Sequence, residues 1–307
     1  MRPFAAIFVI LMLSGMLAPA RAGQSYIIVD DVTGHIFEEK DPNEKRQIAS
    51  LTKVATAMVV LDWADTTKSS VALEVEVPAG IMAVGGINAC GLQPGDRTSL
   101  RDLLYAAMMQ SDNHAAYTLA YNIGQRLPNA QGLSPVDNFT AYTNALARKL
   151  KMKHTLFLNP HGIDNLEVPP YSTAGDMARL TQYAYSNPAF NFYVSQPSRE
   201  ITIAGPDGMR RAFMLQNTNQ LLGQEGIAGV KTGRTTRAGD CLILAASRDP
   251  QTVEVEGQKV AIPRRIIVIL LGSTNRFGEG LELVRRGWGM HDRWTSEGRL
   301  LSKRSSL

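Results

Sequence analysis

The sequence has few residues of the kinds that form disulfide bonds or bind metals. Its 307 residues include two cysteines, Cys90 and Cys241, and five histidines. Two cysteines allow one disulfide bond, but they set no disulfide framework, and two free thiols are the simpler interpretation. The histidines and cysteines show none of the spacings that are typical of zinc sites. We therefore expect neither a metal site nor a cofactor.

A strong excess of charge of one sign is also missing. The formal net charge is +4 at pH 7, which argues against a nucleic-acid partner. Basic residues gather near the C-terminus, where they outnumber the acidic ones; they are Arg285, Arg286, Arg293, Arg299, Lys303 and Arg304. We expect residues 291–307 to form a basic tail that is solvated or contacts an anionic wall or membrane surface.

Long apolar runs are absent except at the N-terminus. Residues 1–22 contain Arg2, an apolar stretch that is short for a membrane span, and Ala20-Arg21-Ala22 before Gly23. This pattern is typical of a secretory signal peptide that is removed after residue 22, and an uncleaved anchor is the alternative. We therefore expect an exported protein, periplasmic or otherwise extracytoplasmic, with no stable membrane anchor after cleavage.

The remaining chain, residues 23–290, shows no repeat and is long enough for one substantial core. We expect strands at both ends of this chain and helices in its middle. The expected strands are Tyr26–Asp30, His35–Glu39 and the later stretches REITIA, MRRAFML, IAGVKTG, DCLILAAS and RRIIVILLG. The expected helices are 50–65, 100–110, 113–126, 135–150, one that begins after Ser172 or Thr173, and 275–290. We predict an α+β fold, an α/β sandwich in which both ends of the chain build an antiparallel sheet and a helical lobe is inserted.

Ser50 and Lys53 lie three residues apart at the start of the apolar run IASLTKVATAMVVL. Apolar residues recur there at helical spacing, so the two side chains share one face, one turn apart. A serine hydroxyl becomes a nucleophile when a base takes its proton. A lysine can be that base if its surroundings lower its pKa from about 10.4 toward 7. The pair therefore predicts a nucleophile with its base, and an exposed serine followed by a surface lysine is the alternative.

Two further triplets carry groups that could meet this pair. Ser111 and Asn113 lie between two expected helices, where a loop can aim a hydroxyl and an amide in one direction. A polar cap of the next helix is the alternative. At the end of an expected strand, Lys231 offers charge, Thr232 a hydroxyl for a carboxylate, and Gly233 room for a ligand beside the backbone. A turn after an edge strand is the alternative there.

The three motifs occur in the order Ser-x-x-Lys, Ser-x-Asn and Lys-Thr-Gly, each in the context that the chemistry requires. This set resembles that of the low-molecular-mass penicillin-binding proteins, which include serine-type D-alanyl-D-alanine carboxypeptidases and their D,D-endopeptidase relatives. Further similar stretches are ASLTK, ATAMVVLD, LQPGD, SDNHAA, LNPHGID and VKTGRTTRAGDCLILAAS. The resemblance covers about Tyr26 to Met290. It implies a β-lactamase/transpeptidase-like fold, with residues 23–290 as the penicillin-binding D,D-peptidase domain.

The resemblance also implies catalytic roles for the first two motifs. Ser50 would be the acylated nucleophile, and Lys53 would be the base that activates it. Ser111 would relay a proton to the leaving amine. Asn113 would hold the substrate amide.

The third motif and its neighbour have implied roles in binding. Lys231 would supply positive charge and help to lower the pKa of Lys53. Thr232 would bind the terminal carboxylate, and Gly233 would admit the substrate. The backbone N–H of Arg234, with that of the serine nucleophile, would form an oxyanion hole.

The implied activity is that of a serine D,D-peptidase, which removes the terminal D-alanine from peptidoglycan stem peptides and is covalently inhibited by β-lactam antibiotics such as penicillins. A β-lactamase is a weaker alternative, because it needs a carboxylate to activate the deacylating water. Glu167 is in the right region, but it lies among prolines and lacks the nearby asparagine of that pattern. A non-catalytic penicillin-binding or wall-binding module is also weaker, since it has no need of Lys53.

One stretch departs from the carboxypeptidase branch of the family. Typical members carry an arginine in the middle of an Asn-x-Asn stretch ahead of Lys-Thr-Gly, where it helps to hold the free carboxylate of D-alanine. Here the stretch is Asn217-Thr218-Asn219, which is similar to the endopeptidase branch. The side chain of Arg234 could partly replace the missing guanidinium. We expect a carboxypeptidase, with an endopeptidase that cuts peptide cross-links as the close alternative.

Overall fold

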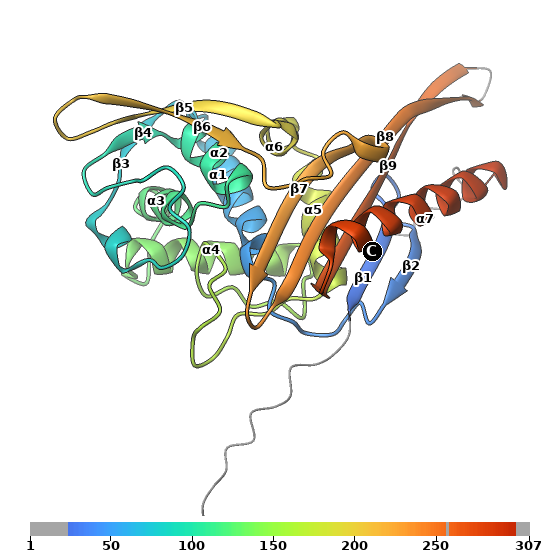
Figure 1. Ribbon diagram of the computed structural model, residues 1–307, viewed down its shortest axis with the longest axis horizontal. Coiled ribbons are helices and arrows are strands. Elements are labelled where there is room, and N and C mark those ends of the chain that lie inside the picture. Colours follow the sequence, from blue (N-terminus) through green and yellow to red (C-terminus); the bar gives the residue numbers. More distant parts are fainter. Residues whose placement is uncertain (1–23, 256–257, 299–307) are drawn as a thin grey trace, which may run out of the picture.

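A five-stranded antiparallel sheet joins the two ends of the chain in the computed structural model, which describes residues 24–255 and 258–298 (Figure 1). Its order is β2-β1-β9-β8-β7. The strands are β1 (Ser25–Asp30), β2 (Ile36–Lys40), β7 (Ile227–Thr235), β8 (Gly239–Val255) and β9 (Gln258–Ser273). Because β1 pairs with β9 from Ser25↔Leu271 to Asp30↔Ile266, the predicted sheet from both termini is confirmed. The predicted signal peptide, residues 1–22, lies outside the described residues.

The sheet is covered on both faces because side chains alternate along its buried strands. Leu242 and Leu244 of β8 face one cluster, which includes Trp288 of the last helix, α7 (Arg276–Ser296). The intervening Ile243 and Ala245 face the larger cluster, which the helical lobe completes. Figure 1 shows α7 across one side of the sheet and α5 behind the other.

The helical lobe is built around α1 (Lys53–Thr67), which is buried nearly all round. A helix that is apolar on every side must lie inside a core, and α1 is buried from Lys53 through Leu61. A short 3₁₀ turn, η1 (Ala49–Thr52), leads into it. The surrounding helices are α2 (Leu100–Met109), α3 (Asn113–Gly124), α4 (Pro135–Lys149), α5 (Ala174–Tyr185) and α6 (Pro188–Ser195). The lobe that the sequence predicts is therefore present.

A second, smaller sheet closes the far side of the lobe. Its order is β3-β4-β5-β6. The strands are β3 (Glu74–Glu76), β4 (Arg97–Ser99), β5 (Ser198–Ala204) and β6 (Arg210–Gln216). Two short 3₁₀ turns, η2 (Ala79–Ala83) and η3 (Gln224–Gly226), complete the elements. The β5–β6 hairpin is as predicted, whereas the three-residue β4 was not predicted.

The helix starts follow the capping residues of the sequence. Ser99 accepts a hydrogen bond from the backbone N–H of Asp102 at the start of α2, and Thr173 accepts one from Asp176 at the start of α5. These caps satisfy N–H groups that a helix leaves without partners. The unpredicted α6 starts in the same way, with Asn187 as the cap and Pro188 in the first turn, so the signal for it was present in the sequence.

The last helix is longer than predicted. It ends at Ser296 rather than at Met290, and both His291 and Trp294 are buried. The reason is that Trp288, His291 and Trp294 recur at helical spacing and extend the apolar face of α7. The predicted start of a basic tail at residue 291 was therefore wrong. Residues 299–307 lie outside the described part of the chain.

The described residues contain neither a disulfide bond nor a helix that could span a membrane. Cys90 and Cys241 are both buried as free thiols. Within residues 24–255 and 258–298, no helix has both the length and the apolar character that a membrane span needs.

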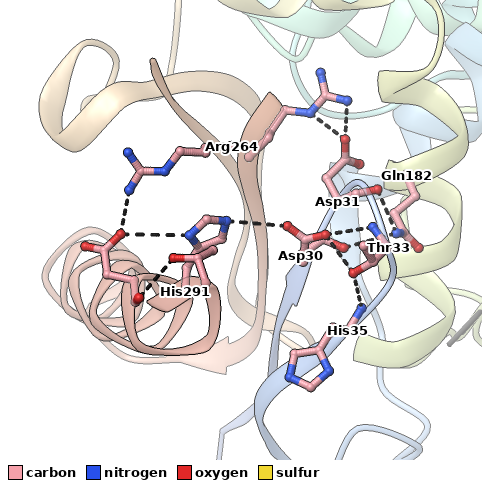
Figure 2. Close-up of polar contacts among 10 residues, drawn as sticks. Asp30, Asp31, Thr33, His35, Gln182, Arg264 and His291 are labelled. Carbon is pink, nitrogen blue, oxygen red and sulfur yellow. Dashed lines mark hydrogen bonds and ion pairs between the residues drawn. The ribbon is translucent and has the colours of Figure 1, made fainter. Parts of the chain in front are cut away.

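His291 lies in a buried polar cluster between α7 and the start of the sheet (Figure 2). Its Nε2 is 3.7 Å from Oδ1 of Asp30, both side chains are fully buried, and its Nδ1 is 3.9 Å from Oδ1 of Asp292. Among the described residues, neither imidazole nitrogen has a hydrogen-bond partner. The rings of Trp288 and Trp294 pack against it. Burial lowers the pKa of His291, although the charge of Asp30 opposes the change.

We predict that acidification weakens the fold through His291. Since burial lowers its pKa from the ordinary value of 6.5, the imidazole stays neutral in the folded protein at a pH where the unfolded chain is already protonated. The free energy of unfolding should therefore fall as the pH drops below about 6.5. His291→Gln cannot take up this proton and should reduce that slope by up to about 1.4 kcal/mol per pH unit. Urea unfolding at a series of pH values measures the slope, and an unchanged slope would contradict a neutral buried imidazole.

Candidate active site

Ser50 lies in the 3₁₀ turn η1, immediately before α1 rather than inside it. The turn is held by its own residues: Ala49 adopts a positive φ of 48°, and Thr52 Oγ1 donates to the Ala49 carbonyl at 3.0 Å. A positive φ is costly for a residue with a side chain and is commonly retained at functional sites. Ser50 is half-buried, whereas its neighbours on both sides are buried. Its hydroxyl is therefore presented at the N-terminal end of the central helix.

The amine of Lys53 is fully buried beneath this hydroxyl. Its Nζ is hydrogen-bonded to Ser50 Oγ at 3.0 Å, to Asn113 Oδ1 at 2.7 Å and to the His161 carbonyl at 2.9 Å. Burial lowers the pKa of Lys53 to about 7, although the charge of Asp112 opposes this. An amine that is neutral near pH 7 and within reach of a hydroxyl can accept its proton.

The Ser111–Asn113 segment forms the predicted loop between α2 and α3. Ser111 has a φ of 62° and is nearly buried. Among the described residues, its hydroxyl has no hydrogen-bond partner. Asp112 caps α3 by accepting from the Ala115 N–H at 2.8 Å. Asn113 is anchored through Nδ2, which donates to the Gly85 carbonyl at 2.9 Å. The segment thus provides both the cap of α3, from Asp112, and an amide that contacts Lys53, from Asn113.

The Lys-Thr-Gly motif lies on β7, against the turn that carries the serine. A Cβ placed on Gly233 would lie 3.1 Å from the backbone N of Ser50. The glycine therefore makes room for the serine turn, and its role in admitting a substrate stays a prediction. Thr232 Oγ1 is 2.8 Å from Thr218 Oγ1. Thr218, the residue in place of the arginine of typical carboxypeptidases, thus lies beside the motif, and the side chain of Arg234 is 76% exposed.

Lys231 and Lys53 are both buried amines with lowered pKa values. Lys231 is buried, and its Nζ donates to the Thr232 carbonyl at 3.0 Å. Burial and then the positive charges of Lys53 and Arg276 hold the pKa of Lys231 well below its usual value. The lowered pKa of Lys53 results from burial. Because a positive charge on either amine disfavours a second charge on the other, the effect of Lys231 on the pKa of Lys53 stays a prediction.

Two residues that the sequence analysis did not assign complete the frame. The His161 carbonyl is a partner of the Lys53 amine, and burial lowers the pKa of the His161 imidazole to about 3, with further contributions from Lys53 and His114. Arg276 donates from Nη1 to the Gly233 carbonyl at 3.0 Å. The stretch LNPHGID suggested the first by resemblance, but a backbone acceptor has no side-chain signature. Nothing in the spacing of the sequence pointed to Arg276.

The loop that carries His161 is held firmly against the serine turn. Asn159 Oδ1 accepts from the Gly162 N–H at 2.7 Å, and Thr56 Oγ1 of α1 donates to the Pro160 carbonyl at 2.6 Å. Gly162 has a φ of 88°, and a Cβ there would overlap the carbonyl oxygen of Ala49. Only glycine fits this contact.

The fold and the site define a class. A serine and a buried lysine at the start of the central helix, a polar loop between two helices, and a Lys-Thr-Gly strand at the edge of an antiparallel sheet are the arrangement of serine acyl-transfer proteins with a transpeptidase/β-lactamase-like fold.

The family follows from sequence comparison. A model of the S11 peptidases, described as D-alanyl-D-alanine carboxypeptidase, matches residues 14–255, which is more than half of the chain. The chain belongs to this family.

Individual relatives agree with this assignment. The chain is 31% identical over 227 residues to a D-alanyl-D-alanine endopeptidase of Pseudomonas aeruginosa, and the match covers 73% of this chain and 66% of the relative. It is 29% identical over 283 residues to the D-alanyl-D-alanine carboxypeptidase DacC of Escherichia coli, covering 89% of this chain and 62% of the relative. The chain thus spans less than two thirds of the length of these curated relatives.

Solved structures support the same fold. The Streptomyces K15 DD-transpeptidase matches with a TM-score of 0.74 and 27% identity, covering 86% of this chain and 96% of that one. The penicillin-binding protein D2 of Listeria monocytogenes, in its ampicillin-bound form, matches with a TM-score of 0.65 and 28% identity, covering 86% and 96%. The predicted fold class is confirmed.

The contact at Gly162 yields a prediction about the frame of the site. Gly162→Ala should be destabilising by about 1 to 3 kcal/mol beyond the strain of its positive φ, because the new methyl group must push the loop away from Ala49. Gly208→Ala is the matched control, since Gly208 has a similar φ of 80° and open space around its Cβ position. Thermal or urea unfolding of the two variants measures the difference. Equal losses would mean that the loop is not packed against the serine turn as described.

Proposed function

We propose that this protein is an exported serine D,D-peptidase of the periplasm or another extracytoplasmic compartment, without a stable membrane anchor, that acts on peptidoglycan stem peptides. The observation that carries the proposal is the buried Lys53 amine, 3.0 Å from Ser50 Oγ and with a pKa lowered to about 7. Membership of the S11 family supports the choice of substrate.

The proposed reaction proceeds through an acyl-enzyme. Ser50 Oγ attacks the carbonyl carbon of the penultimate D-alanine while Lys53 takes the hydroxyl proton. Ser111 relays a proton to the amine that leaves, and its hydroxyl is free for this because it has no partner among the described residues. Water then attacks the ester and releases the serine. The ester divides one difficult amide cleavage into two easier steps.

Binding of the substrate uses the rest of the motif residues. Asn113, already fixed by Gly85, holds the substrate amide, and Thr232 binds the carboxylate beside the scissile bond with Lys231. An anion there favours the protonated form of Lys231. The backbone N–H groups of Ser50 and Arg234 hold the developing oxyanion, and each such donor contributes about 3 to 4 kcal/mol in comparable sites.

The same site is proposed to be acylated by β-lactam antibiotics. The fold neighbour from Listeria monocytogenes is a penicillin-binding protein that was solved with ampicillin bound. A β-lactamase activity is disfavoured, because Glu167 is exposed in the 162–170 loop and has no hydrogen-bond partner among the described residues. A non-catalytic module is disfavoured by the lowered pKa of Lys53, which pure binding does not require.

Two bonds are candidates for cleavage: the bond to the terminal D-alanine and the peptide cross-link. Carboxypeptidase action is supported by the family description and by relatives such as DacC. Thr218 beside Thr232, where carboxypeptidases of the family place an arginine, favours the endopeptidase alternative, as does the similarity to an endopeptidase. An exposed Arg234, 3.7 Å from Asp240, is available to hold the carboxylate in either case.

Fluorescent penicillin labelling tests the proposed nucleophile and base. Ser50→Ala should abolish labelling and peptide cleavage without loss of fold, because the hydroxyl supplies the bond-forming oxygen. Lys53→Arg should lower the acylation rate at least about a hundredfold, since arginine keeps its charge and cannot give up its proton.

In the unmodified protein, the acylation rate should rise as the pH increases through about 7, where Lys53 becomes neutral. Labelling of the alanine variant, or rapid acylation of the arginine variant, would contradict the mechanism. Slow release of the label identifies a penicillin-binding protein, whereas rapid turnover identifies a β-lactamase.

A comparison of two substrates tests which bond is cut. If Arg234 holds the terminal carboxylate, kcat/KM for D-alanine release from a pentapeptide should be high, and Arg234→Ala should lower it at least about tenfold, or roughly 1.4 kcal/mol. Lys68→Ala, at an exposed position on the end of α1, controls for the loss of a surface charge. If a cross-linked muropeptide dimer is the much better substrate and Arg234→Ala changes little, the protein is an endopeptidase.

A further inference from the structure

A cavity lies away from the proposed active site, at the C-terminal end of α4. We call it the α4 cavity; it has a volume of about 660 Å³ and is lined by the end of the helix and by the segment from Lys151 to Leu156. This volume is within the range of small-molecule sites. None of the motif residues lines it. Figure 1 places α4 in the helical lobe, with α7 on the other side of the sheet.

The charged residues of the α4 cavity are all positive. They are Arg148, Lys151 and Lys153, and each is exposed. No ion pair joins any of the three to another described residue. Asp176, which lies behind the wall, accepts hydrogen bonds from the His154 N–H and the Thr155 hydroxyl and is 3.6 Å from Arg179. Three cations therefore share one cavity with no carboxylate to neutralise them.

Lys151 adopts a left-handed backbone conformation just after the end of α4. The end of α4 is a Schellman motif, because the Met152 N–H donates to the Ala147 carbonyl and the Lys151 N–H to the Arg148 carbonyl. The second residue after the last helical one usually is glycine, since it must adopt a positive φ. Here Lys151 adopts a φ of 57°. Lys68 takes the same conformation at the end of α1, so the feature that distinguishes Lys151 is its charge beside Arg148 and Lys153 in the cavity.

The wall of the α4 cavity is rigid. Asn144 on α4 clamps Phe157 through two hydrogen bonds, from Nδ2 to its carbonyl at 2.8 Å and from its N–H to Oδ1 at 3.0 Å. Leu156 exchanges two backbone hydrogen bonds with Tyr171. A preformed site loses less conformational freedom when a ligand binds.

We propose that the α4 cavity binds a ligand that carries phosphate groups, with at least two negative charges. Two lysines act as point charges that suit phosphate oxygens, and Arg148 can add a bidentate contact. Met152 and Leu156 provide an apolar wall for the body of such a ligand. A phospholipid headgroup and a soluble or polymer-borne phosphate share this chemistry. Basic residues in a last helical turn also interact favourably with the helix dipole, but that role does not extend to Lys153, which lies beyond the end of α4 at Lys149.

Titration with inorganic pyrophosphate, followed by calorimetry, tests the site on the full protein. Lys151→Gly should weaken binding about tenfold, because it removes one of three charges. The melting temperature of this variant should not fall, because glycine relieves the positive φ. Lys68→Gly is the matched control: Lys68 also ends a helix, with a φ of 54°, and does not line the cavity. It should leave the dissociation constant unchanged.

Citrate should bind at least about tenfold more weakly than pyrophosphate. Sedimentation with phosphatidylglycerol vesicles, if it is reduced in Lys151→Gly, identifies a lipid headgroup as the source, whereas binding of pyrophosphate alone identifies a soluble or polymer-borne phosphate. The proposal is overturned if neither probe binds, if citrate binds as tightly as pyrophosphate, or if Lys68→Gly weakens binding as much as Lys151→Gly.

Discussion

The burial of the Lys53 amine is the constraint on which the rest of the site depends. A charged amine without partners is costly inside a protein. This one is accommodated by three acceptors from three separate segments: Ser50 of η1, Asn113 of α3 and the carbonyl of His161. Its lowered pKa reduces the remaining cost, because the neutral amine is easier to bury than the ammonium. Chemistry and packing therefore require the same arrangement, and a shift of any one segment disturbs both.

The sheet completes what the helical lobe begins. The turn η1 holds the serine, and helices α1 and α3 hold the lysine and the asparagine. The Lys-Thr-Gly residues are on β7, at the edge of the sheet. The two halves meet where Gly233 lies against the backbone of Ser50. Arg276, in the first turn of α7, donates a hydrogen bond to the Gly233 carbonyl. The site is thus formed where the helical lobe and the sheet meet, and neither of them contains all of its residues.

Much of this arrangement could be predicted from the sequence, where local chemistry determines the structure. Hydroxyl residues ahead of α2 and α5 marked helix starts, because such side chains satisfy backbone N–H groups. The apolar runs DCLILAAS and RRIIVILLG marked the buried parts of β8 and β9. The proximity of Ser50 and Lys53 followed from helical spacing. The role of the His161 carbonyl could not be predicted, because every residue has a backbone acceptor and only the tertiary fold selects one. The end of α7 was missed because Arg293 and Asp292 interrupt the apolar pattern that His291 and Trp294 continue.

The pairing of β1 with β9 has a consequence for the order in which the molecule assembles. Ser25 pairs with Leu271, near the opposite end of the chain. Contacts between residues so distant in sequence form slowly, because a long loop must close before they contribute any stability. In a chain that emerges N-terminus first, the helical lobe can form early, while β1 can pair with β2 but lacks its second neighbour until β9 arrives. The contact between the sheet and the serine turn is therefore completed late, so a partly emerged chain contains Ser50 and Lys53 but not the completed site.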